Sequence, residues 1–246
     1  MGKLTGKVAL VTGAGRGIGS VIALRLAEDG ASIVVNYANS RAGADEVVSA
    51  IDNKGGKAIA IQADICRRAE IVRMFQRIDR ELGRIDIVVN CAGVSGSTPL
   101  LEDVDEDLVE TILGVNLRGP LYIAAEAAKR LPNGGRIVNF ATSLVQFPFP
   151  RSSVYTGAKA AVKSFTEVWA RELGAKGITV NTVIPGATSP GMMDAAPAYR
   201  EFFEKSSPFG RIGRAEEVAS VVAFLCSPEA SWVSGTHILV NGAANT

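Results

Sequence analysis

Seven short apolar runs, rich in β-branched residues, recur along the 246-residue chain and alternate with longer segments of helical period. The runs are continuous rather than strictly alternating, which is typical of parallel strands that are covered on both faces. They occupy residues 8–11, 32–36, 58–61, 85–89, 136–140, 178–184 and 237–240. Because repeated strand–helix–strand units require right-handed crossovers, the sequence predicts an α/β fold built on an open, doubly wound parallel sheet.

The segments between these runs carry apolar residues at helical spacing. Ile71, Phe75, Ile78 and Leu82 recur at intervals of four, three and four residues, which places them on one face of a helix. We expect helices on both faces of the sheet, at about residues 17–29, 41–53, 67–82, 105–130, 154–175 and 215–226. The chain has no Gly/Ser/Pro-rich linker and no internal repeat, so residues 1–246 are expected to form a single domain.

One stretch, from about residue 187 to residue 211, interrupts the alternation. It holds Pro190, Pro197 and Pro208 together with large apolar residues such as Met192 and Phe202. A loop of this length inside a compact domain is usually a functional lid or a mobile segment. It follows the carboxyl end of a strand, where open α/β sheets bind ligands. We therefore favour a substrate lid over a surface excursion with one short helix.

The charge balance excludes several kinds of partner. Lys and Arg number 26 and Asp and Glu number 25, so the net charge of +1 offers no broad attraction to nucleic acid or to an anionic membrane. No apolar run reaches the roughly 18–20 residues that cross a bilayer, and the N-terminal segment lacks the apolar region of a signal peptide. Cys66, Cys91 and Cys226 are odd in number and widely spaced, which disfavours disulfides and a zinc site. We expect a cytoplasmic protein without a bound metal.

A glycine-rich turn follows the first strand and precedes the first helix. Its glycines, Gly13, Gly15, Gly17 and Gly19, would let the backbone turn sharply and approach a pyrophosphate, while the helix N-terminus presents free N–H groups. The spacing departs from the GxGxxG fingerprint because the third glycine would fall on Ile18, and the turn has no P-loop Lys-Ser/Thr pair. Such turns can be merely structural, but the strand–turn–helix context favours nucleotide binding.

The end of the second strand indicates which dinucleotide is bound. An NAD-selective site usually has an Asp or Glu there to bond the ribose 2′-hydroxyl, but this run has no carboxylate. Asn39 and Ser40 can donate hydrogen bonds to a 2′-phosphate, and Arg16 supplies a guanidinium suited to bidentate phosphate contact. The alternative is an ordinary polar loop with a solvent-facing arginine; we expect NADP(H). The run consists of Asn36, Tyr37, Ala38, Asn39 and Ser40.

Tyr155 and Lys159 lie one turn apart at the start of a predicted helix. A free phenol has a pKa of about 10, and each unit by which it is lowered requires ~1.4 kcal/mol of preferential stabilisation of the phenolate. A neighbouring ammonium acts in that direction, as does the positive nicotinamide ring of an oxidised cofactor. The phenol could then act as an acid or a base near neutral pH, although the spacing alone is a common accident.

Together these motifs resemble the short-chain dehydrogenase/reductase family, and the match covers essentially the whole chain. The matching segments come in the family's order: Thr12-Gly13-Ala14-Gly15-Arg16-Gly17-Ile18-Gly19, Asn90-Cys91-Ala92-Gly93, Asn116, Tyr155-x-x-x-Lys159 and Pro185-Gly186. Within the family, the chain is most similar to NADPH-dependent ketoreductases of the β-ketoacyl-ACP reductase and trihydroxynaphthalene reductase kind. The resemblance implies a Rossmann fold with a seven-stranded sheet. It also implies a homotetramer held by the outer faces of the helices near 105–130 and 154–175, although these helices could simply cover the sheet.

The resemblance also assigns roles to residues. It implies that Tyr155 donates a proton, that Lys159 holds the nicotinamide ribose hydroxyls and lowers the tyrosine pKa, and that Asn116 anchors a water of the proton relay. The cofactor contacts that it implies, beyond those of Tyr155 and Lys159, come from residues at the ends of successive strands. They are Gly13, Gly15, Arg16, Gly17, Ile18, Gly19 and the run from Asn36 to Ser40; Asp64 and Ile65 at the adenine; Asn90, Ala92 and Gly93 on the adenosine side; and Pro185, Gly186 and Thr188 at the nicotinamide.

Two positions depart from the family's pattern. Cys91 replaces the second Asn of an Asn-Asn-Ala-Gly run, and we interpret it as a buried thiol rather than a nucleophile. Related reductases commonly place the catalytic serine thirteen positions before the tyrosine, where this chain has Thr142, followed by Ser143. A threonine hydroxyl can still donate to a substrate carbonyl, so Thr142 is the first candidate and Ser143 the reserve.

The sequence thus predicts an enzyme that reduces a small-molecule ketone with NADPH. Apolar residues at 147–149 and in the lid favour a hydrophobic ketone, but the aromatic residues at 147–149 could equally pack against a partner subunit. The alternatives are an NAD(P)-dependent alcohol or sugar dehydrogenase that works oxidatively, and a protein that binds NADP(H) without turnover. The intact Asn116, Tyr155 and Lys159 argue against the last. His237, the only histidine, lies far from these residues in the sequence, so we expect it in the core or on the surface rather than in catalysis.

Overall fold

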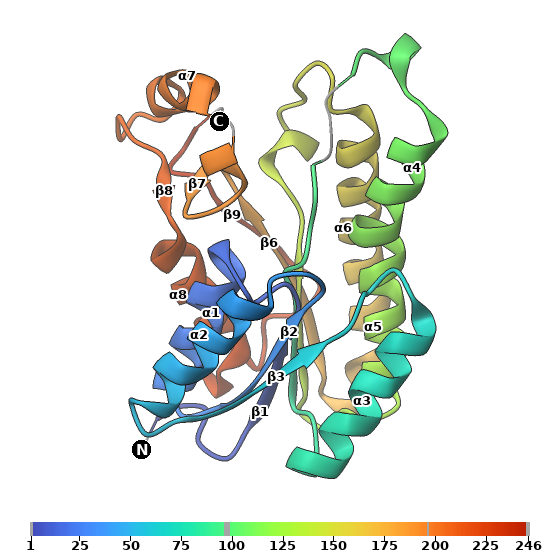
Figure 1. The fold of residues 1–246 in the computed structure, drawn as a ribbon, viewed down its shortest axis with the longest axis vertical. Helices are drawn as coiled ribbons and strands as arrows, with labels where there is room; N and C mark the ends of the chain where they lie inside the picture. The colour runs from blue at the N-terminus through green and yellow to red at the C-terminus, as the bar shows by residue number, and fades with distance from the viewer. Residues whose placement is uncertain (1, 96–98, 196, 245–246) are drawn as a thin grey trace.

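The computed structural model describes residues 2–95, 99–195 and 197–244, and its helices cover both faces of a parallel β-sheet (Figure 1). The sheet has seven strands in the order β3-β2-β1-β4-β5-β6-β9, and every neighbouring pair is parallel. The predicted doubly wound, seven-stranded parallel sheet is confirmed. Its strands are β1 (Val8–Val11), β2 (Ser32–Tyr37), β3 (Lys57–Gln62), β4 (Ile87–Asn90), β5 (Arg136–Phe140), β6 (Thr179–Pro185) and β9 (His237–Val240).

Alternate residues of the central strands enter two separate hydrophobic cores. In β1, Ala9 and Val11 belong to the core under α1, α2 and α8, whereas Val8 and Leu10 belong to the core under α3, α5 and α6. Since residues i and i+2 of a strand share a face, burial on both faces explains the continuous apolar runs. The helices are α1 (Gly17–Glu28), α2 (Arg41–Asp52), α3 (Arg68–Leu82), α5 (Gly119–Ala128), α6 (Ser153–Leu173) and α8 (Ala215–Cys226).

The helix expected near residues 105–130 is divided. α4 (Glu106–Leu113) begins after Asp105, whose side chain accepts a hydrogen bond from the N–H of Leu108 at 2.7 Å. A π-helical stretch, η2 (Gly114–Arg118), then separates α4 from α5. Such π-bulges occur frequently at functional sites. Here the stretch carries Asn116, one of the predicted site residues.

The segment between β6 and α8 is tied at its base by a second, two-stranded sheet that the sequence did not predict. β7 (Thr188–Ser189) pairs in parallel with β8 (Gly213–Arg214), so the chain between them forms a closed excursion. Its described part holds η5 (Met192–Ala195), η6 (Pro197–Tyr199) and α7 (Arg200–Ser206); residue 196 lies outside the described residues. Figure 1 shows α7 at the end of the molecule toward which β6 and β9 lead.

Four further short 3-10 turns connect the larger elements. They are η1 (Leu101–Asp103), η3 (Ser143–Val145), η4 (Gly174–Lys176) and η7 (Pro228–Ala230). None of the helices in the described part of the chain combines the length and the apolar composition that a membrane span needs.

Candidate active site

The glycine-rich turn lies between β1 and α1, and other parts of the backbone approach it from two sides. Gly13 has a φ of +66°, and a Cβ at this position would lie 2.9 Å from the Cα of Ala92. A Cβ on Gly15 would lie 2.9 Å from the carbonyl oxygen of Ser40, at the start of α2. The turn is therefore pressed between the segment after β4 and the N-terminus of α2.

Two polar side chains fix the shape of this turn. The Oγ1 of Thr12 accepts hydrogen bonds from the N–H groups of Cys91 and Ala92, both at 3.1 Å. Asn36 is buried; its Oδ1 accepts a hydrogen bond from Gly13 at 3.4 Å, and its Nδ2 donates to the carbonyl of Ala63 at 3.1 Å. Asn36 thus supports the turn from inside the protein.

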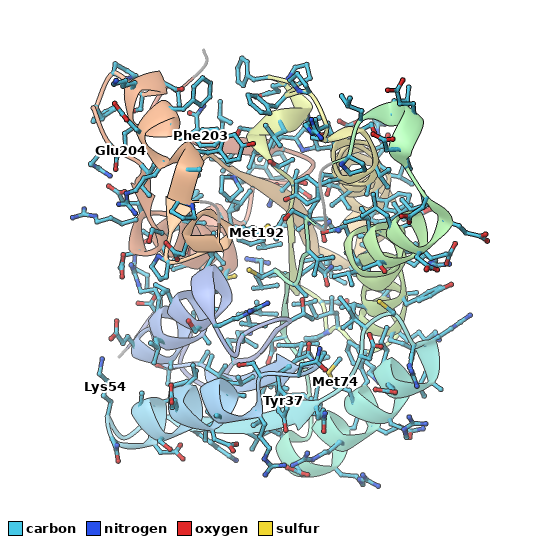
Figure 2. The ribbon with its side chains drawn as sticks, turned by 45° about the horizontal axis from the view of Figure 1, so that its top comes forward. Tyr37, Lys54, Met74, Met192, Phe203 and Glu204 are labelled. Atoms are coloured by element: carbon cyan, nitrogen blue, oxygen red, sulfur yellow. The ribbon has the colours of Figure 1, made fainter. Side chains whose placement is uncertain are left out.

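The other residues of the run at the end of β2 differ in exposure. The side chain of Tyr37, labelled in Figure 2, lies in the core with α1 and α2, whereas Ala38 and Asn39 are exposed. Ser40 leads directly into α2, whose first turn has no acidic residue, and Arg41 is the first residue of that helix. Arg41 was not among the residues predicted from the sequence; its place immediately after Ser40 was the available signal.

Two arginines lie near this end of the turn, and one of them pairs with an acidic residue. Arg16 is exposed at the residue preceding α1, and Arg41 lies 3.3 Å from Asp45 with both side chains largely exposed. Helix N-termini carry partial positive charge, and guanidinium groups suit phosphate. Arg16 and the N-terminal end of α2 are therefore the groups at this corner that suit a phosphate.

Asp64 and Ile65 follow β3 on the same edge of the sheet. Ile65 is buried and packs against α5, since its Cδ1 would lie 2.7 Å from a Cβ on Gly119. Asp64 is half-buried, and its Oδ1 accepts a hydrogen bond from the N–H of Cys66 at 2.9 Å. The structure brings this pair to the edge that carries the glycine turn.

Tyr155 lies in the first turn of α6 and meets Thr142, the residue that precedes η3. Burial raises the pKa of Tyr155 to about 12, while a hydrogen bond with the Thr142 side chain acts in the opposite direction. Ser143 is partly exposed and follows Thr142 in η3. The phenol is therefore protonated at neutral pH, which is the state that a proton donor needs.

Lys159 is buried one turn further along α6. Its Nζ donates a hydrogen bond to the carbonyl of Phe140 at 3.0 Å rather than to the phenol, and burial lowers its pKa to about 8. Burial of the phenol raises the pKa of Tyr155 more than the hydrogen bond with Thr142 lowers it, and the lowering that the resemblance implies for Lys159 stays a prediction. Burial also raises the pKa of Cys91 to about 12, so this cysteine is a thiol at neutral pH.

Asn116 and Lys159 converge on Gly93, at the start of the segment that follows β4. A Cβ on Gly93 would lie 3.1 Å from the Oδ1 of Asn116 and 3.6 Å from the Nζ of Lys159. The Nδ2 of Asn116 donates to the carbonyls of Val94 and Ile112, at 2.7 and 3.0 Å. The π-helical stretch thus places Asn116 where it holds the chain beside Lys159.

A buried polar chain joins the same elements beneath the site. The Nδ2 of Asn90 donates to the Oδ1 of Asn139 at 2.8 Å, and the Nδ2 of Asn139 donates to the Oγ1 of Thr166 in α6, also at 2.8 Å. The hydroxyls of Thr166 and Thr182 are 2.7 Å apart. Asn90, predicted on the adenosine side, therefore uses its amide to tie β4 through β5 to the helix that carries Tyr155.

The end of β6 supplies the remaining predicted residues. Pro185 is the last residue of β6, and Gly186 follows it. Thr188 is buried, and its hydroxyl donates to the carbonyl of Gly186 at 3.0 Å. Met192, in the excursion that follows, was not predicted as a site residue. Its Sδ lies 4.0 Å from the Tyr155 hydroxyl, and Figure 2 shows it between the lobe that carries α7 and the centre of the molecule.

Two other sequence expectations concern groups outside this cluster. The Nε2 of His237 lies 2.8 Å from the Oε1 of Glu167, which joins β9 to α6. Within the described residues, no group of three or more His, Cys, Asp or Glu is placed to hold a metal ion.

The strand order defines the class to which this arrangement belongs. β1 lies between β2 and β4, so successive strands are added on one side of β1 first and then on the other. Open α/β sheets bind their ligands in the crevice at this reversal of strand order, outside the carboxyl ends of the strands. The glycine turn, the Tyr155–Lys159 pair and Thr142 all follow strands at this edge. The fold and the site are those of a dinucleotide-binding α/β oxidoreductase.

Comparison with known proteins gives the family. A family model described as "Enoyl-(Acyl carrier protein) reductase" matches residues 13–245. A "Short-chain type dehydrogenase/reductase" from Picea abies is 42% identical over 97% of this chain and 92% of its own length. A "Hydroxynaphthalene reductase-like protein" from Metarhizium robertsii is 41% identical over 99% of this chain and 96% of its own length. The chain belongs to the short-chain dehydrogenase/reductase family.

Solved structures agree with this assignment. A short chain dehydrogenase from Burkholderia cenocepacia, in complex with NADP, superposes with a TM-score of 0.95 at 39% identity and covers 99% of this chain and 100% of its own. The angucycline C-6 ketoreductase LanV with bound NADP gives a TM-score of 0.94 at 35% identity over 99% and 97% of the two chains. The expectations of an oxidoreductase and of an NADP(H) cofactor agree with these neighbours.

Proposed function

We propose that this protein binds NADP(H) and reduces a ketone to a secondary alcohol, with Tyr155 as the general acid. The observation that carries the proposal is the meeting of a protonated Tyr155 with Thr142, beside the buried Lys159, at the edge of the sheet that holds the glycine turn. The NADP-bound ketoreductases among the structural neighbours support the same reaction class.

The residues present fit a dinucleotide. The backbone of the glycine turn passes so close to Ala92 that a side chain at Gly13 would fill the space, and Thr12 holds the two segments together. Arg16 and Arg41, with the hydroxyl of Ser40 and no acid in the first turn of α2, favour a 2′-phosphate and hence NADP(H) over NAD(H). Asp64 and Ile65 would flank the adenine, and Pro185, Gly186 and Thr188 the nicotinamide.

The bound cofactor supplies the two electrons and the hydrogen that reach the carbonyl carbon. Thr142 would donate a hydrogen bond to the carbonyl oxygen and stabilise the charge that develops there, with Ser143 as the reserve for this role. Tyr155 would give that oxygen its proton, breaking the phenolic O–H bond. Lys159 and Asn116, which converge beside it, would return a proton from solvent and position the nicotinamide ribose.

The excursion at about residues 187–211 would act as the substrate lid. The two-stranded β7–β8 sheet closes its base, and Met192 contacts Tyr155, so the lid borders the reacting group directly. We also propose a homotetramer in the cytoplasm. Leu121 on α5 and Val168 on α6 are exposed apolar residues on the outer faces that would form subunit contacts, and the described cysteines are unpaired.

Steady-state assays of the wild-type protein test this function. A panel of uncharged ketones should give ketone-dependent oxidation of NADPH, with kcat/KM at least about tenfold above that with NADH. Activity restricted to alcohols with NAD+ would instead identify an oxidative dehydrogenase. Tight binding of NADPH without turnover of any ketone or alcohol would identify a non-catalytic binding protein.

A further inference from the structure

Three partly exposed aromatic rings come together from two separate parts of the chain. None of them belongs to the catalytic or cofactor-binding residues named above. The ring of Phe149, in the loop between η3 and α6, lies 6.3 Å from the ring of Tyr199 and 5.9 Å from that of Phe202. The ring planes cross at 84° and 57°. We call Phe149, Tyr199 and Phe202 the aromatic clasp. Each keeps between 38% and 50% of its surface exposed, so the cluster still presents apolar surface to a further group.

The clasp has a fixed position relative to Tyr155. The carbonyl of Phe149 accepts a hydrogen bond from the hydroxyl of Ser152 at 2.6 Å, and the hydroxyl of Thr156 lies 3.0 Å from that of Ser152. The backbone of Phe149 is therefore anchored to the first turn of α6, which carries Tyr155. On the lid side, Tyr199 and Phe202 follow η5, whose Met192 touches the Tyr155 hydroxyl. The clasp and Met192 thus belong to the two segments that border the catalytic tyrosine.

The charged residues of α7 do not offer an ionic alternative. Arg200 pairs with Glu204 at 2.9 Å, and Lys205 pairs with Glu201 at 2.6 Å, so the four charges of this helix neutralise one another. Figure 2 shows Glu204 on the outer side of the lid lobe and Phe203, whose ring lies 5.3 Å from that of Phe202, on the side toward the body of the protein. What α7 presents toward Phe149 is aromatic surface without a free charge.

We propose that the aromatic clasp is a binding subsite for an aromatic ring, and that the preferred substrate is an uncharged ketone that carries a fused or attached aromatic ring. This inference rests on the proposed ketone reduction at Tyr155. Aromatic rings prefer edge-to-face or offset contacts with centroids about 4.5–7 Å apart, and a flat ring can meet Phe149 and Phe202 in this way. Thioethers make favourable contacts with ring edges, and that of Met192 lies 4.0 Å from the Tyr155 hydroxyl, where it can meet the same substrate.

Paired substrates and paired variants test the subsite. 2-Tetralone and 2-decalone share a carbon frame and a ketone, but only 2-tetralone carries an aromatic ring. With NADPH, the wild type should have a higher kcat/KM for 2-tetralone. Phe149→Leu and Phe202→Leu should each lower the ratio of the two kcat/KM values about threefold to tenfold, as the loss of an aromatic pair implies. Phe209→Leu is the matched control, because Phe209 is 68% exposed in the same excursion but lies outside the clasp; its ratio should stay within about twofold of the wild type.

Three results would overturn the subsite. The first is an unchanged ratio of kcat/KM for 2-tetralone to that for 2-decalone in both clasp variants, with both variants shown to be folded by circular dichroism. The second is loss of subunit association in light scattering with that ratio unchanged, which would make the clasp a contact with a second copy of the chain. If no ketone is reduced, the proposed function fails, and 2-naphthol binding to the protein with NADP+ then tests the clasp directly. Equal dissociation constants in the wild type and in Phe202→Leu would refute it, and a threefold or greater weakening would support it.

Discussion

Replacing Gly13 by alanine tests whether the glycine turn must lie directly against the segment after β4. The φ of +66° costs an L-residue about 1–2 kcal/mol. The added Cβ would also lie 2.9 Å from the Cα of Ala92, which forces backbone to move, and overpacking of this kind costs about 1–3 kcal/mol. We expect Gly13→Ala to lose about 2–5 kcal/mol of stability. NADPH affinity should fall at least about tenfold, because the displaced segments are those that would hold the dinucleotide.

The chain provides a control that separates the two costs. Gly55 has a φ of +78° and nothing within 4 Å of the position of its Cβ, so Gly55→Ala meets only the conformational strain. It should lose about 1–2 kcal/mol and bind NADPH as the wild type does. Urea unfolding and calorimetric titration with NADPH measure both quantities. Equal losses of stability in the two variants, with the NADPH affinity of Gly13→Ala unchanged, would refute the close packing of the turn and its role in binding.

Three further outcomes follow from the site. Arg16→Ala should weaken NADPH binding about tenfold and leave NADH binding nearly unchanged in titrations; equal weakening of both would contradict recognition of the 2′-phosphate. Because burial lowers the pKa of Lys159 to about 8, the native protein binds fewer protons than the unfolded chain between pH 8 and pH 10. In urea unfolding over this window, the free energy of unfolding of the wild type should rise relative to that of Lys159→Met, by up to ~1.4 kcal/mol per pH unit. A difference between the two proteins that stays constant with pH would show that the lysine is not desolvated. Thr166→Val leaves the Nδ2 of Asn139 without its acceptor and should lose about 1–3 kcal/mol in urea unfolding, whereas Thr166→Ser should lose less than half as much.

The sequence predicted the sheet and its helices because burial on both faces imposes a pattern that can be read locally. Continuous β-branched runs marked all seven strands of the main sheet, and apolar residues at helical spacing marked the main helices. The π-helical stretch around Asn116 was missed, since a helix that inserts one wide turn keeps nearly the same apolar pattern. The β7–β8 pair was missed because two-residue strands have no periodicity at all.

The site was predicted less completely, for a different reason. Motif positions such as Tyr155 and Gly13 depend on neighbours that are close in sequence, but the contact of Met192 with Tyr155 depends on how the lid folds back. The roles of Asn36 and Asn90 as internal supports depend on burial, which a polar residue in a strand does not reveal. The direction of the Tyr155 pKa shift likewise depends on burial of the phenol, which the motif does not reveal.

The central claim is that Tyr155 donates the proton to the substrate oxygen, and Tyr155→Phe tests it most directly. This variant keeps the ring and removes only the hydroxyl that meets Thr142 and Met192. With NADPH binding first shown to be within about twofold of the wild type, ketone-dependent NADPH oxidation should fall by at least a factor of about 100, the lower range for loss of a general acid. Oxidation at the wild-type rate across the ketone panel would contradict the account.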